Sequence, residues 1–472
     1  MKIEKTVISQ LIKIVKLYPK KIALVVNKKK YTYEELYNNS KSIAEKIIYK
    51  SKNEKIIGIG LDRSELQIFS IIACILAKKS FIILDEKITN LKKKIILDKL
   101  KIKTIICEKK KLIFKNKKIL IINKNFRIIN DSNFDKNYYS GIIYYIFTSG
   151  STGEPKGIKI NNSNLLSFIS NCIKTFNFSK NERFILLPYL SFDLSVFPLW
   201  ISLCSGSTLF YTTGSDIIYP INYIKQNKIT IYCSVPSQIN LITDVLNNNK
   251  IALNSVKKSF FCGEPLKNSQ VLSWKKFFKK TKVYNTYGPT ETTCFNTFFE
   301  VKKIAKSKLN EIVSIGKPLP NNKLILKNGE IFIEGPQVSH GYFDNNQNNS
   351  FIKKDKNYIY KTGDYAKKIK NDYYFVGRKD QQIKVSGYRL ELGEIEKTVL
   401  GVLKKNYGIV AIFYNKKIVI AIETKVPLSN IQKSKINENL PSYAIPSKYV
   451  YFDEFPLNKN LKIDVKKIKE KI

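Results

Sequence analysis

The sequence predicts an α/β protein with a large N-terminal domain of doubly wound sheets and a small C-terminal α+β domain. Its length of 472 residues exceeds what one hydrophobic core ordinarily supports, so at least two domains are expected. Between residues 55 and 235, short apolar β-rich runs alternate with helical patterns, which is typical of sheets covered by helices. From Asp380 onward, roughly 90 residues form a compact pattern of their own. The predicted domains are therefore residues 1–379 and 380–472.

The individual elements follow from the spacing of apolar residues. The first predicted strands are Ile56–Gly60, Phe81–Leu84, Thr104–Cys107 and Ile119–Ile122. The helical patterns among them are Glu65–Ala77 and Leu91–Leu100. The alternation continues through Thr208–Tyr211, Ile221–Gln226, Ile229–Cys233 and Gln238–Leu246. In the C-terminal part the predicted helices are Gly393–Leu403 and Asn430–Asn439, and the predicted strands are Ile409–Tyr414 and Lys417–Glu423.

Basic residues are in large excess. The chain has 82 lysines and arginines against 38 acidic residues, which gives a formal net charge of +44. Such a charge would suit nucleic acid or an anionic surface. Only five of these residues are arginines, however, and the 77 lysines are spread along the whole chain, as an AT-rich coding bias would produce. Because clustered arginines and stacking aromatic residues are missing from the sequence, no nucleic-acid partner is expected.

Several classes of protein are excluded by the sequence. No segment approaches the ~20 apolar residues of a membrane span, and the amino terminus lacks an apolar signal region, so a cytoplasmic protein without membrane insertion is expected. The seven cysteines include no Cys-x-x-Cys pair, which argues against a disulfide framework and a zinc site. The single histidine, His340, cannot supply two imidazoles to a metal, and we expect it to be structural.

The segment Phe147–Gly157 has the composition of a loop that binds polyphosphate. It reads Phe-Thr-Ser-Gly-Ser-Thr-Gly-Glu-Pro-Lys-Gly, so its glycines allow positive φ while its hydroxyls and its lysine supply donors. It differs from the common phosphate loop, which runs through Gly-Lys-Ser/Thr into a helix, because predicted strands flank it on both sides. A flexible hairpin is the alternative. The residues expected to contact an anion are Thr148, Ser149, Gly150, Ser151, Thr152, Gly153 and Lys156.

Arginine marks a second informative segment. Because lysine has displaced arginine nearly everywhere, the remaining arginines are candidates for positions that need a planar bidentate donor. Two of the five, Arg378 and Arg389, lie in Gly377–Glu396 at the predicted domain boundary. By itself this segment could be a boundary held by ion pairs. Its sequence is similar to the hinge of the amino-acid adenylation enzymes, and Phe147–Gly157 resembles the phosphate-binding signature of their superfamily, the AMP-forming adenylating enzymes.

Further motifs of that family follow in its own order along nearly the full chain. They are Leu190–Ser195, similar to the element whose aspartate pairs with a substrate ammonium; Asn285–Thr293, similar to the adenine and magnesium element; Gly329–Tyr342, similar to a strand pair; Tyr360–Asp364, similar to the ribose-binding turn; and Pro456–Val465, in the place of the terminal lysine loop. Phe261-Cys-Gly-Glu264 adds the cysteine that ligases for D-alanine and its carrier protein place beside a small side chain. The resemblance is closest to these ligases and to related stand-alone adenylation enzymes.

The resemblance implies a two-step reaction that uses ATP and Mg²⁺. A carboxylate attacks the α-phosphate to give an acyl-adenylate and pyrophosphate, and the phosphopantetheine thiol of a separate carrier protein then takes the acyl group. Catalysis would rest on positioning and charge, with Lys462 between carboxylate and phosphate, Glu291 at Mg²⁺ and Thr148 at the phosphates. Rotation of the small, mobile C-terminal domain about Asp380 would separate the two steps. The implied ATP-binding residues outside the loop are Gly263, Glu264, Asn285, Thr286, Tyr287, Gly288, Thr290, Asp364, Arg378 and Lys462.

The implied substrate is a small amino acid. Asp193 lies between Phe192 and Leu194, where an unpaired carboxylate would be costly and an ammonium group would satisfy it. An acyl-CoA synthetase would have no use for this aspartate. By resemblance, the substrate is surrounded by Asp193, Leu194, Phe197, Cys233, Phe260, Cys262, Thr286, Cys294 and Phe295. This lining has no group to meet an acidic or basic side chain and favours D-alanine, with L-alanine, serine, cysteine or a modest aliphatic amino acid as alternatives.

Two departures from the family pattern keep other functions open. Ala77-Lys-Lys-Ser80 stands where the family has Ala-Gly-Gly, and Leu461 replaces the glycine before Lys462. Leucine does not readily adopt the positive φ that glycine allows. Leu461 therefore leaves a catalytically inactive adenylate-binding regulator as an alternative. The main rival among enzymes is an acyl-CoA or aryl-CoA ligase, which Asp193 and the hinge sequence disfavour.

Overall fold

The computed structural model describes most of the chain. The described residues are 3–109, 114, 116–122, 139–148, 155–249, 253–304, 311–355, 357–378, 382–385, 387–403, 407–415, 417–457 and 463–472. The chain divides into two compact units, of which the first comprises Met1–Asp85, Leu97–Ile146 and Gly157–Lys379, and the second Glu86–Ile96, Phe147–Lys156 and Asp380–Ile472. Asp380 itself lies outside the described residues, so its role as a hinge stays a prediction.

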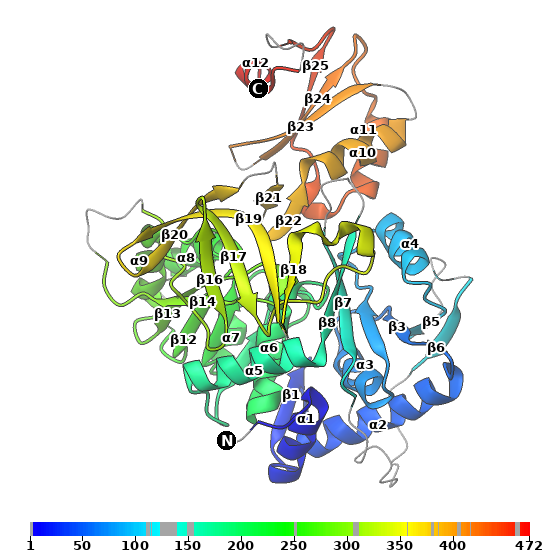
Figure 1. Ribbon diagram of the computed structural model, residues 1–472, viewed down its shortest axis with the longest axis vertical. Helices are drawn as coiled ribbons and strands as arrows, with labels where there is room; N and C mark the ends of the chain where they lie inside the picture. Colours follow the sequence, from blue (N-terminus) through cyan, green and yellow to red (C-terminus); the bar gives the residue numbers. More distant parts are fainter. Residues whose placement is uncertain are drawn as a thin grey trace. The chain divides into compact units, whose positions relative to one another are not determined.

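A nine-stranded sheet dominates the first unit (Figure 1). Its strand order is β15-β14-β13-β12-β11-β9-β10-β1-β2, and the run from β13 to β1 is parallel. These central strands read as nearly continuous apolar runs because helices cover both faces of a parallel sheet. The strands are β1 (Ile22–Val26), β2 (Lys29–Thr32), β9 (Arg183–Leu186), β10 (Thr208–Tyr211), β11 (Ile231–Ser234), β12 (Lys258–Phe261), β13 (Lys282–Tyr287), β14 (Thr297–Glu300) and β15 (Lys317–Pro318).

Two further sheets belong to this unit, apart from the ends of β7 and β8, which group with the second unit. A six-stranded sheet has the order β6-β5-β3-β4-β7-β8, and an antiparallel sheet has the order β16-β17-β19-β18, with β20 paired to β19. The six-stranded sheet contains β3 (Ile56–Ile59), β4 (Ser80–Ile83), β5 (Thr104–Cys107), β6 (Lys118–Ile121), β7 (Ile142–Thr148) and β8 (Lys156–Asn161). The antiparallel sheet contains β16 (Lys323–Lys327), β17 (Glu330–Gly335), β18 (Phe351–Lys354), β19 (Asn357–Ile369) and β20 (Asp372–Arg378).

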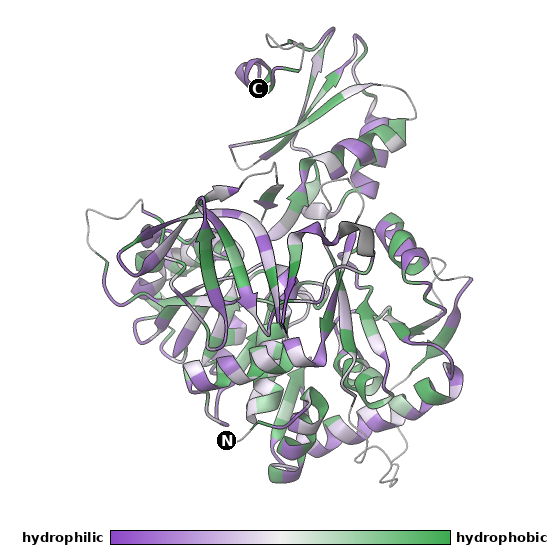
Figure 2. Ribbon diagram, viewed as in Figure 1, coloured by the Kyte–Doolittle hydropathy of each residue, from purple (hydrophilic) through white to green (hydrophobic). Residues whose placement is uncertain are grey.

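Amphipathic helices complete the first unit. In α2, Thr32 and Glu35 form a capping box at the first turn, and the apolar residues Leu36, Ile43 and Ile47 are fully buried. Figure 2 shows the result as alternating hydrophobic and hydrophilic colour along this helix. The helices are α1 (Val7–Leu17), α2 (Tyr33–Lys50), α3 (Glu65–Leu76), α5 (Asn162–Phe176), α6 (Val196–Ser205), α7 (Ile221–Gln226), α8 (Ser237–Asn249) and α9 (Asn268–Phe277). Helix α4 (Asn90–Lys99) crosses the division between the units.

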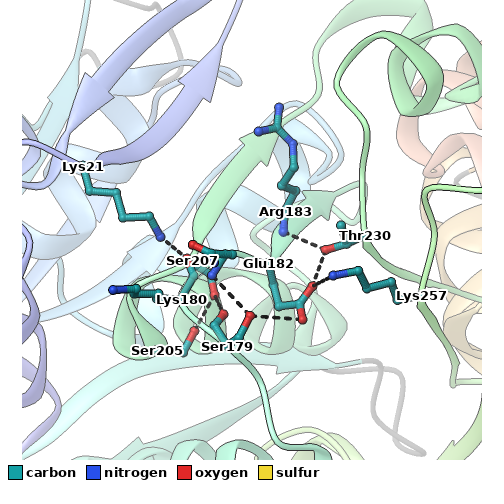
Figure 3. Close-up of polar contacts among 10 residues, drawn as sticks. Lys21, Ser179, Lys180, Glu182, Arg183, Ser205, Ser207, Thr230 and Lys257 are labelled. Carbon is teal, nitrogen blue, oxygen red and sulfur yellow. Dashed lines mark hydrogen bonds and ion pairs between the residues drawn. The ribbon is translucent and has the colours of Figure 1, made fainter.

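A buried polar network fixes the amino end of β9 (Figure 3). The Glu182 carboxylate accepts a hydrogen bond from Thr230 Oγ1 at 2.6 Å, and the backbone N–H of Arg183 donates to the same hydroxyl oxygen at 2.8 Å. Lys257 Nζ lies 3.9 Å from the carboxylate. These contacts satisfy a side chain that would otherwise be costly to bury, and they anchor the strand that leads to Asp193.

The second unit has its own small core. Its sheet has the order β23-β24-β25, and α10 packs on it with Ile395 and Val399 buried against Ile420. Lys92 of α4 pairs with Glu394 of α10 at 3.2 Å, which joins the segment Glu86–Ile96 to this unit. The elements are β21 (Gln382–Val385), β22 (Tyr388–Glu391), α10 (Leu392–Leu403), β23 (Gly408–Tyr414), β24 (Lys417–Glu423), α11 (Asn430–Asn439), β25 (Lys448–Phe452) and α12 (Val465–Glu470).

The predicted fold class is confirmed. The chain is a mixed α/β protein with large parallel sheets and a C-terminal α+β part, and α10 and α11 start within one residue of their predicted positions. No helix in the described part of the chain is both long and apolar enough to cross a membrane.

Candidate active site

The predicted substrate residues of the first unit gather at one edge of the nine-stranded sheet. β9 leads through a short loop into the 3-10 helix Asp193–Ser195, and β12 is followed directly by Cys262. The carboxyl ends of parallel strands form the edge at which open α/β sheets bind ligands. The register places Cys233 beside Phe260 and Phe260 beside Tyr284, so the pleat puts these side chains on one face. Thr286, two positions after Tyr284, belongs to the same face.

Asp193 is fixed by a neighbouring loop. Thr290 Oγ1 donates a hydrogen bond to Asp193 Oδ2 at 2.5 Å, and Thr290 itself is buried. Burial raises the pKa of the Cys294 thiol well above its usual value, and the negative charge of Asp193 raises it further. Cys294 is therefore a neutral thiol in a setting of low polarity. A carboxylate in such surroundings attracts a cationic ligand.

Aromatic rings close the far side of this region. Phe197, Phe260 and Phe295 have no exposed surface, and the ring centroid of Phe197 lies 4.7 Å from that of Phe260 and 5.3 Å from that of Phe295. Each ring is also part of the main hydrophobic core, where Phe295 meets Phe168 edge-on at 5.0 Å. The three rings, which were assigned from the sequence to the substrate lining, thus form a packed aromatic wall. Leu194 is buried in the 3-10 helix beside them.

A fourth cysteine joins the three that the sequence indicated. The pKa of the Cys294 thiol is raised, after burial and Asp193, by Cys262, Cys233 and also Cys172 of α5. All four thiols are buried and reduced. Cys172 was missed from the sequence because it lies on a helix about 60 residues before Cys233, and only the fold brings the two together.

Asp364 is the centre of a second group. It is 2% exposed, accepts a hydrogen bond from Tyr287 Oη at 2.7 Å, and forms an ion pair with Arg378. The β19 and β20 register pairs Asp364 directly with Arg378, which explains why the turn and the arginine meet. Burial and the charge of Asp364 raise the pKa of Tyr287 well above its usual value, so Tyr287 acts as a neutral donor.

Replacing Tyr287 with phenylalanine is expected to lower the free energy of unfolding by about 1.5–3 kcal/mol, because the hydroxyl donates to a charged acceptor inside the protein. The measurement is urea denaturation of the ligand-free protein. Tyr144→Phe is the matched control, since the Tyr144 hydroxyl is equally buried and has no hydrogen-bond partner among the described residues. Equal losses in the two variants would contradict a special contribution of the bond between Tyr287 and Asp364.

Other predicted ATP-binding residues also stabilise the fold. Asn285 Nδ2 donates to the carbonyl oxygens of Val313 and Ser314 at 3.2 and 2.8 Å, so its amide hydrogens are directed to the backbone and its carbonyl oxygen is what it offers a ligand. Glu264 accepts from the N–H and the hydroxyl of Ser237 at 2.8 and 3.2 Å, at the start of α8.

Glycine is required at two predicted positions. A Cβ at Gly288 would lie 2.5 Å from the Cα of Phe295, so no other residue fits beneath the Phe295 backbone. Gly263 has φ of 93°, which glycine adopts without strain. Thr286 Oγ1 between them in sequence donates to the carbonyl of Phe261 at 3.1 Å.

Glu291 is fully buried in the 3-10 helix Thr290–Thr292. Tyr342 Oη donates to its Oε1 at 2.8 Å, and the hydroxyl of Tyr360 lies 3.4 Å from that of Tyr342. The sequence did not assign these tyrosines, since 51 residues separate Tyr342 from Glu291. Carboxylate oxygens such as those of Glu291 are the type of ligand that a hard cation prefers.

Thr148 and Lys156 belong to the second unit and are considered by themselves. Thr148 ends β7, is 8% exposed, and its hydroxyl has no hydrogen-bond partner within the described ranges. Lys156 begins β8 and is half-buried. The remaining predicted residues of the phosphate loop, Ser149, Gly150, Ser151, Thr152 and Gly153, and the predicted catalytic Lys462 lie outside the described residues.

The described residues contain no cluster of three histidine, cysteine or acidic side chains that could hold a metal ion. His340 stacks on Tyr358 with ring centroids 4.8 Å apart, and its Nδ1 lies 2.7 Å from Asn161 Nδ2. Burial and Lys159 lower its pKa. A metal centre built from three such side chains is therefore not formed by this part of the chain.

The family follows from comparison with known proteins. Residues 12–343 match the AMP-binding enzyme family. The chain therefore belongs to this family, and it is an AMP-forming ligase of the superfamily of adenylating enzymes. It is 34% identical over 356 residues to the D-alanine--D-alanyl carrier protein ligase of Bacillus licheniformis, covering 70% of this chain and 71% of the relative. Identity to the protein of the same name from Staphylococcus epidermidis is 35% over 358 residues, covering 72% and 73%.

Solved structures share the fold. The Vibrio cholerae adenylation domain AlmE, in complex with glycyl-adenosine-5'-phosphate, has a TM-score of 0.86 at 22% identity and covers 100% of this chain and 98% of that one. PA1221, an NRPS protein containing adenylation and PCP domains, has a TM-score of 0.84 at 19% identity and covers 99% and 84%. At these identities the likeness concerns the fold alone. The prediction of an adenylating enzyme is confirmed by the family.

Proposed function

We propose that this ligase activates a small amino acid, with D-alanine as first choice, and transfers it to the phosphopantetheine thiol of a separate carrier protein. A carboxylate oxygen of the amino acid bonds to the α-phosphorus of ATP, and the bond from that phosphorus to the bridging oxygen breaks, so that pyrophosphate leaves. The thiol sulfur then attacks the carbonyl carbon, the bond to AMP breaks, and the thiol proton passes to solvent. The products are AMP and the aminoacyl thioester.

The setting of Asp193 is the observation that carries the choice of an amino acid. Its carboxylate is held in place by Thr290 beside the buried thiol of Cys294, and a substrate ammonium would neutralise it there. The packed rings of Phe197, Phe260 and Phe295 favour a small side chain. The names of the relatives from Bacillus and Staphylococcus support D-alanine within this class.

The other residues would serve ATP. Asp364, with Arg378 beside it, would accept the two ribose hydroxyls, while the face of Tyr287 would meet adenine. Glu291 would supply one oxygen to Mg²⁺, and phosphate oxygens would supply others, in keeping with the preference of this ion for one or two carboxylates. Mg²⁺ would neutralise the triphosphate charge. The loop with Thr148 and Lys156 would bind the β- and γ-phosphates, and Lys462 would bridge carboxylate and α-phosphate.

Amino-acid-dependent exchange of pyrophosphate into ATP tests the proposal. The assay should cover both enantiomers of alanine, then glycine, serine, cysteine and valine, with propionate as the acid that lacks an α-amino group. We expect D-alanine to support the fastest exchange and propionate almost none. Discrimination among the small amino acids should be modest, since one methylene is worth only about 1–3 kcal/mol. Faster activation of propionate than of every amino acid would overturn the substrate class.

The basic surface should assist the second step. With a formal net charge of +44, the protein should attract an acidic carrier protein, so the rate of thioester transfer should fall steeply as salt rises from 50 to 500 mM. Pyrophosphate exchange under the same salt series is the control, because it needs no carrier protein. A transfer rate that does not respond to salt would show that the lysines are solvated surface residues that do not attract the carrier protein.

A further inference from the structure

Arg63 holds the carboxyl end of the strand that leads to Asp193. It follows β3 and precedes α3, and its guanidinium donates to the carbonyl oxygens of Leu186–Pro188 at 2.8 to 3.2 Å. Its Nε also donates to the carbonyl oxygen of Thr212, just after β10, at 2.8 Å. One side chain from the six-stranded sheet therefore binds the ends of two adjacent strands in the nine-stranded sheet.

Aromatic rings and a carboxylate complete this arrangement. The Arg63 guanidinium carbon lies 4.9 Å from the ring centroid of Tyr189 and 4.5 Å from that of Tyr211. Two residues after Tyr189, the backbone N–H of Ser191 donates to Asp85 Oδ2 at 3.3 Å. The contacts with residues 186–191 act on the chain between the end of β9 and Asp193, and those with Tyr211 and Thr212 act on the end of β10.

The rest of the loop is short and internally bonded. The N–H of Phe192 donates to the carbonyl of Tyr189 at 3.0 Å, and the N–H of Ser195 donates to the carbonyl of Phe192 at 3.1 Å. These turns restrict the backbone conformation after Tyr189. The position of the Arg63 guanidinium therefore sets the position of the Asp193 carboxylate. Lysine has displaced arginine nearly everywhere in this chain, which has 77 lysines. The arginine retained at position 63 is consistent with a need for several donors in one plane.

We propose that Arg63 is a positioning residue for the substrate ammonium, acting through the loop Leu187–Phe192 on Asp193. The inference rests on the proposed function, because it assigns Arg63 to the amino-acid half of the site. The Arg63 guanidinium acts on the chain that leads to Asp193, the residue assigned to the substrate ammonium and not to ATP. Its loss should therefore weaken amino-acid binding selectively.

The test compares Arg63→Lys with Arg183→Lys. Arg183 is a matched control because it is also half-buried, donates to a backbone carbonyl, that of Asn227, at 2.6 Å, and stacks on Phe210 at 4.5 Å, but it lies at the opposite end of β9. In the exchange assay, Arg63→Lys should raise KM for the amino acid about tenfold or more while KM for ATP changes less than about twofold, since a shift of about 1 Å at a charged contact has effects of this size. Arg183→Lys should leave both values within about twofold.

Inhibition by propionate separates positioning from general damage. Propionate lacks the ammonium group, so its inhibition constant should be the same in Arg63→Lys and in the original protein. If Arg63→Lys does not fold, Thr212→Val decides. It removes the hydroxyl that accepts from Arg63 Nη2 at 3.2 Å and donates to the carbonyl oxygen of Leu186 at 2.8 Å, and it should raise KM for the amino acid severalfold. Equal weakening of ATP, amino acid and propionate would overturn the inference. A protein that exchanges pyrophosphate with no amino acid would instead refute the proposed function on which it rests.

Discussion

Replacing Asp193 with alanine should lower kcat/KM for every amino acid between about a hundredfold and several thousandfold. Removing one partner of a desolvated charge pair costs about 3–5 kcal/mol, because the remaining charge is left buried without a counterion. In the proposed reaction the stranded charge would be the substrate ammonium, next to the neutral thiol of Cys294. The loss should appear mainly in KM for the amino acid, whereas KM for ATP should be nearly unchanged. Steady-state pyrophosphate exchange measures both values.

Two controls make this result specific. Thr290→Val removes the hydroxyl that donates to Asp193 Oδ2 but keeps the carboxylate, so it should have a smaller effect in the same direction, about tenfold. Propionate should inhibit Asp193→Ala at least as well as it inhibits the original protein. An Asp193→Ala variant that still activates amino acids at the original rate would show that the ammonium binds elsewhere.

Replacing Lys462 with alanine should reduce adenylate formation about a hundredfold or more while ATP still binds. The substrate carboxylate and the α-phosphate are both anionic, so bringing them together requires a cation whose contact strengthens as the transition state forms. Losing one such contact costs about 3 kcal/mol or more. Rapid-quench measurement of adenylate formation and calorimetric titration with ATP give the two quantities.

Lys466→Ala is the matched control for Lys462→Ala. It removes the same charge from an exposed position on α12, four residues later, and should leave adenylation unchanged. Normal adenylation in Lys462→Ala would remove Lys462 from the reaction. In that case Leu461, which stands where the family has glycine, would also have no effect on adenylation.

The elements with strong local patterns were predictable, and their order in the sheets was not. The limits of α3, α10 and α11 match the prediction to within one residue. In α10 the buried residues form an apolar stripe, whereas α3 is buried on all sides and α11 buries only Ile436. In contrast, β9 lies between β11 and β10, and β1 pairs with β10 across more than 180 residues. Pairing of this kind depends on long-range packing, which the periodicity of a single segment does not contain.

The candidate site also combines residues that the sequence predicted with contacts that only the fold creates. The motifs indicated Asp193, Glu291 and Asp364 and some of their partners, such as Arg378, but gave no role to Tyr342 or Arg63. Tyr342 reaches Glu291 through the fold, and the carbonyl partners of Arg63 are backbone atoms, which carry no signal in the residue type. Such supporting contacts become visible only when segments distant in sequence are brought together.

The aromatic wall has a consequence for changing substrate range by engineering or by natural drift. Phe197, Phe260 and Phe295 pack on one another and on the deeper core, so trimming any one of them to alanine would leave a void inside a crowded cluster at a cost of about 3–5 kcal/mol. A broader specificity therefore requires coordinated replacement of several rings, with lost volume restored behind them. Single-step mutational paths toward larger amino acids would pass through destabilised proteins, which would make the proposed preference for small substrates hard to change.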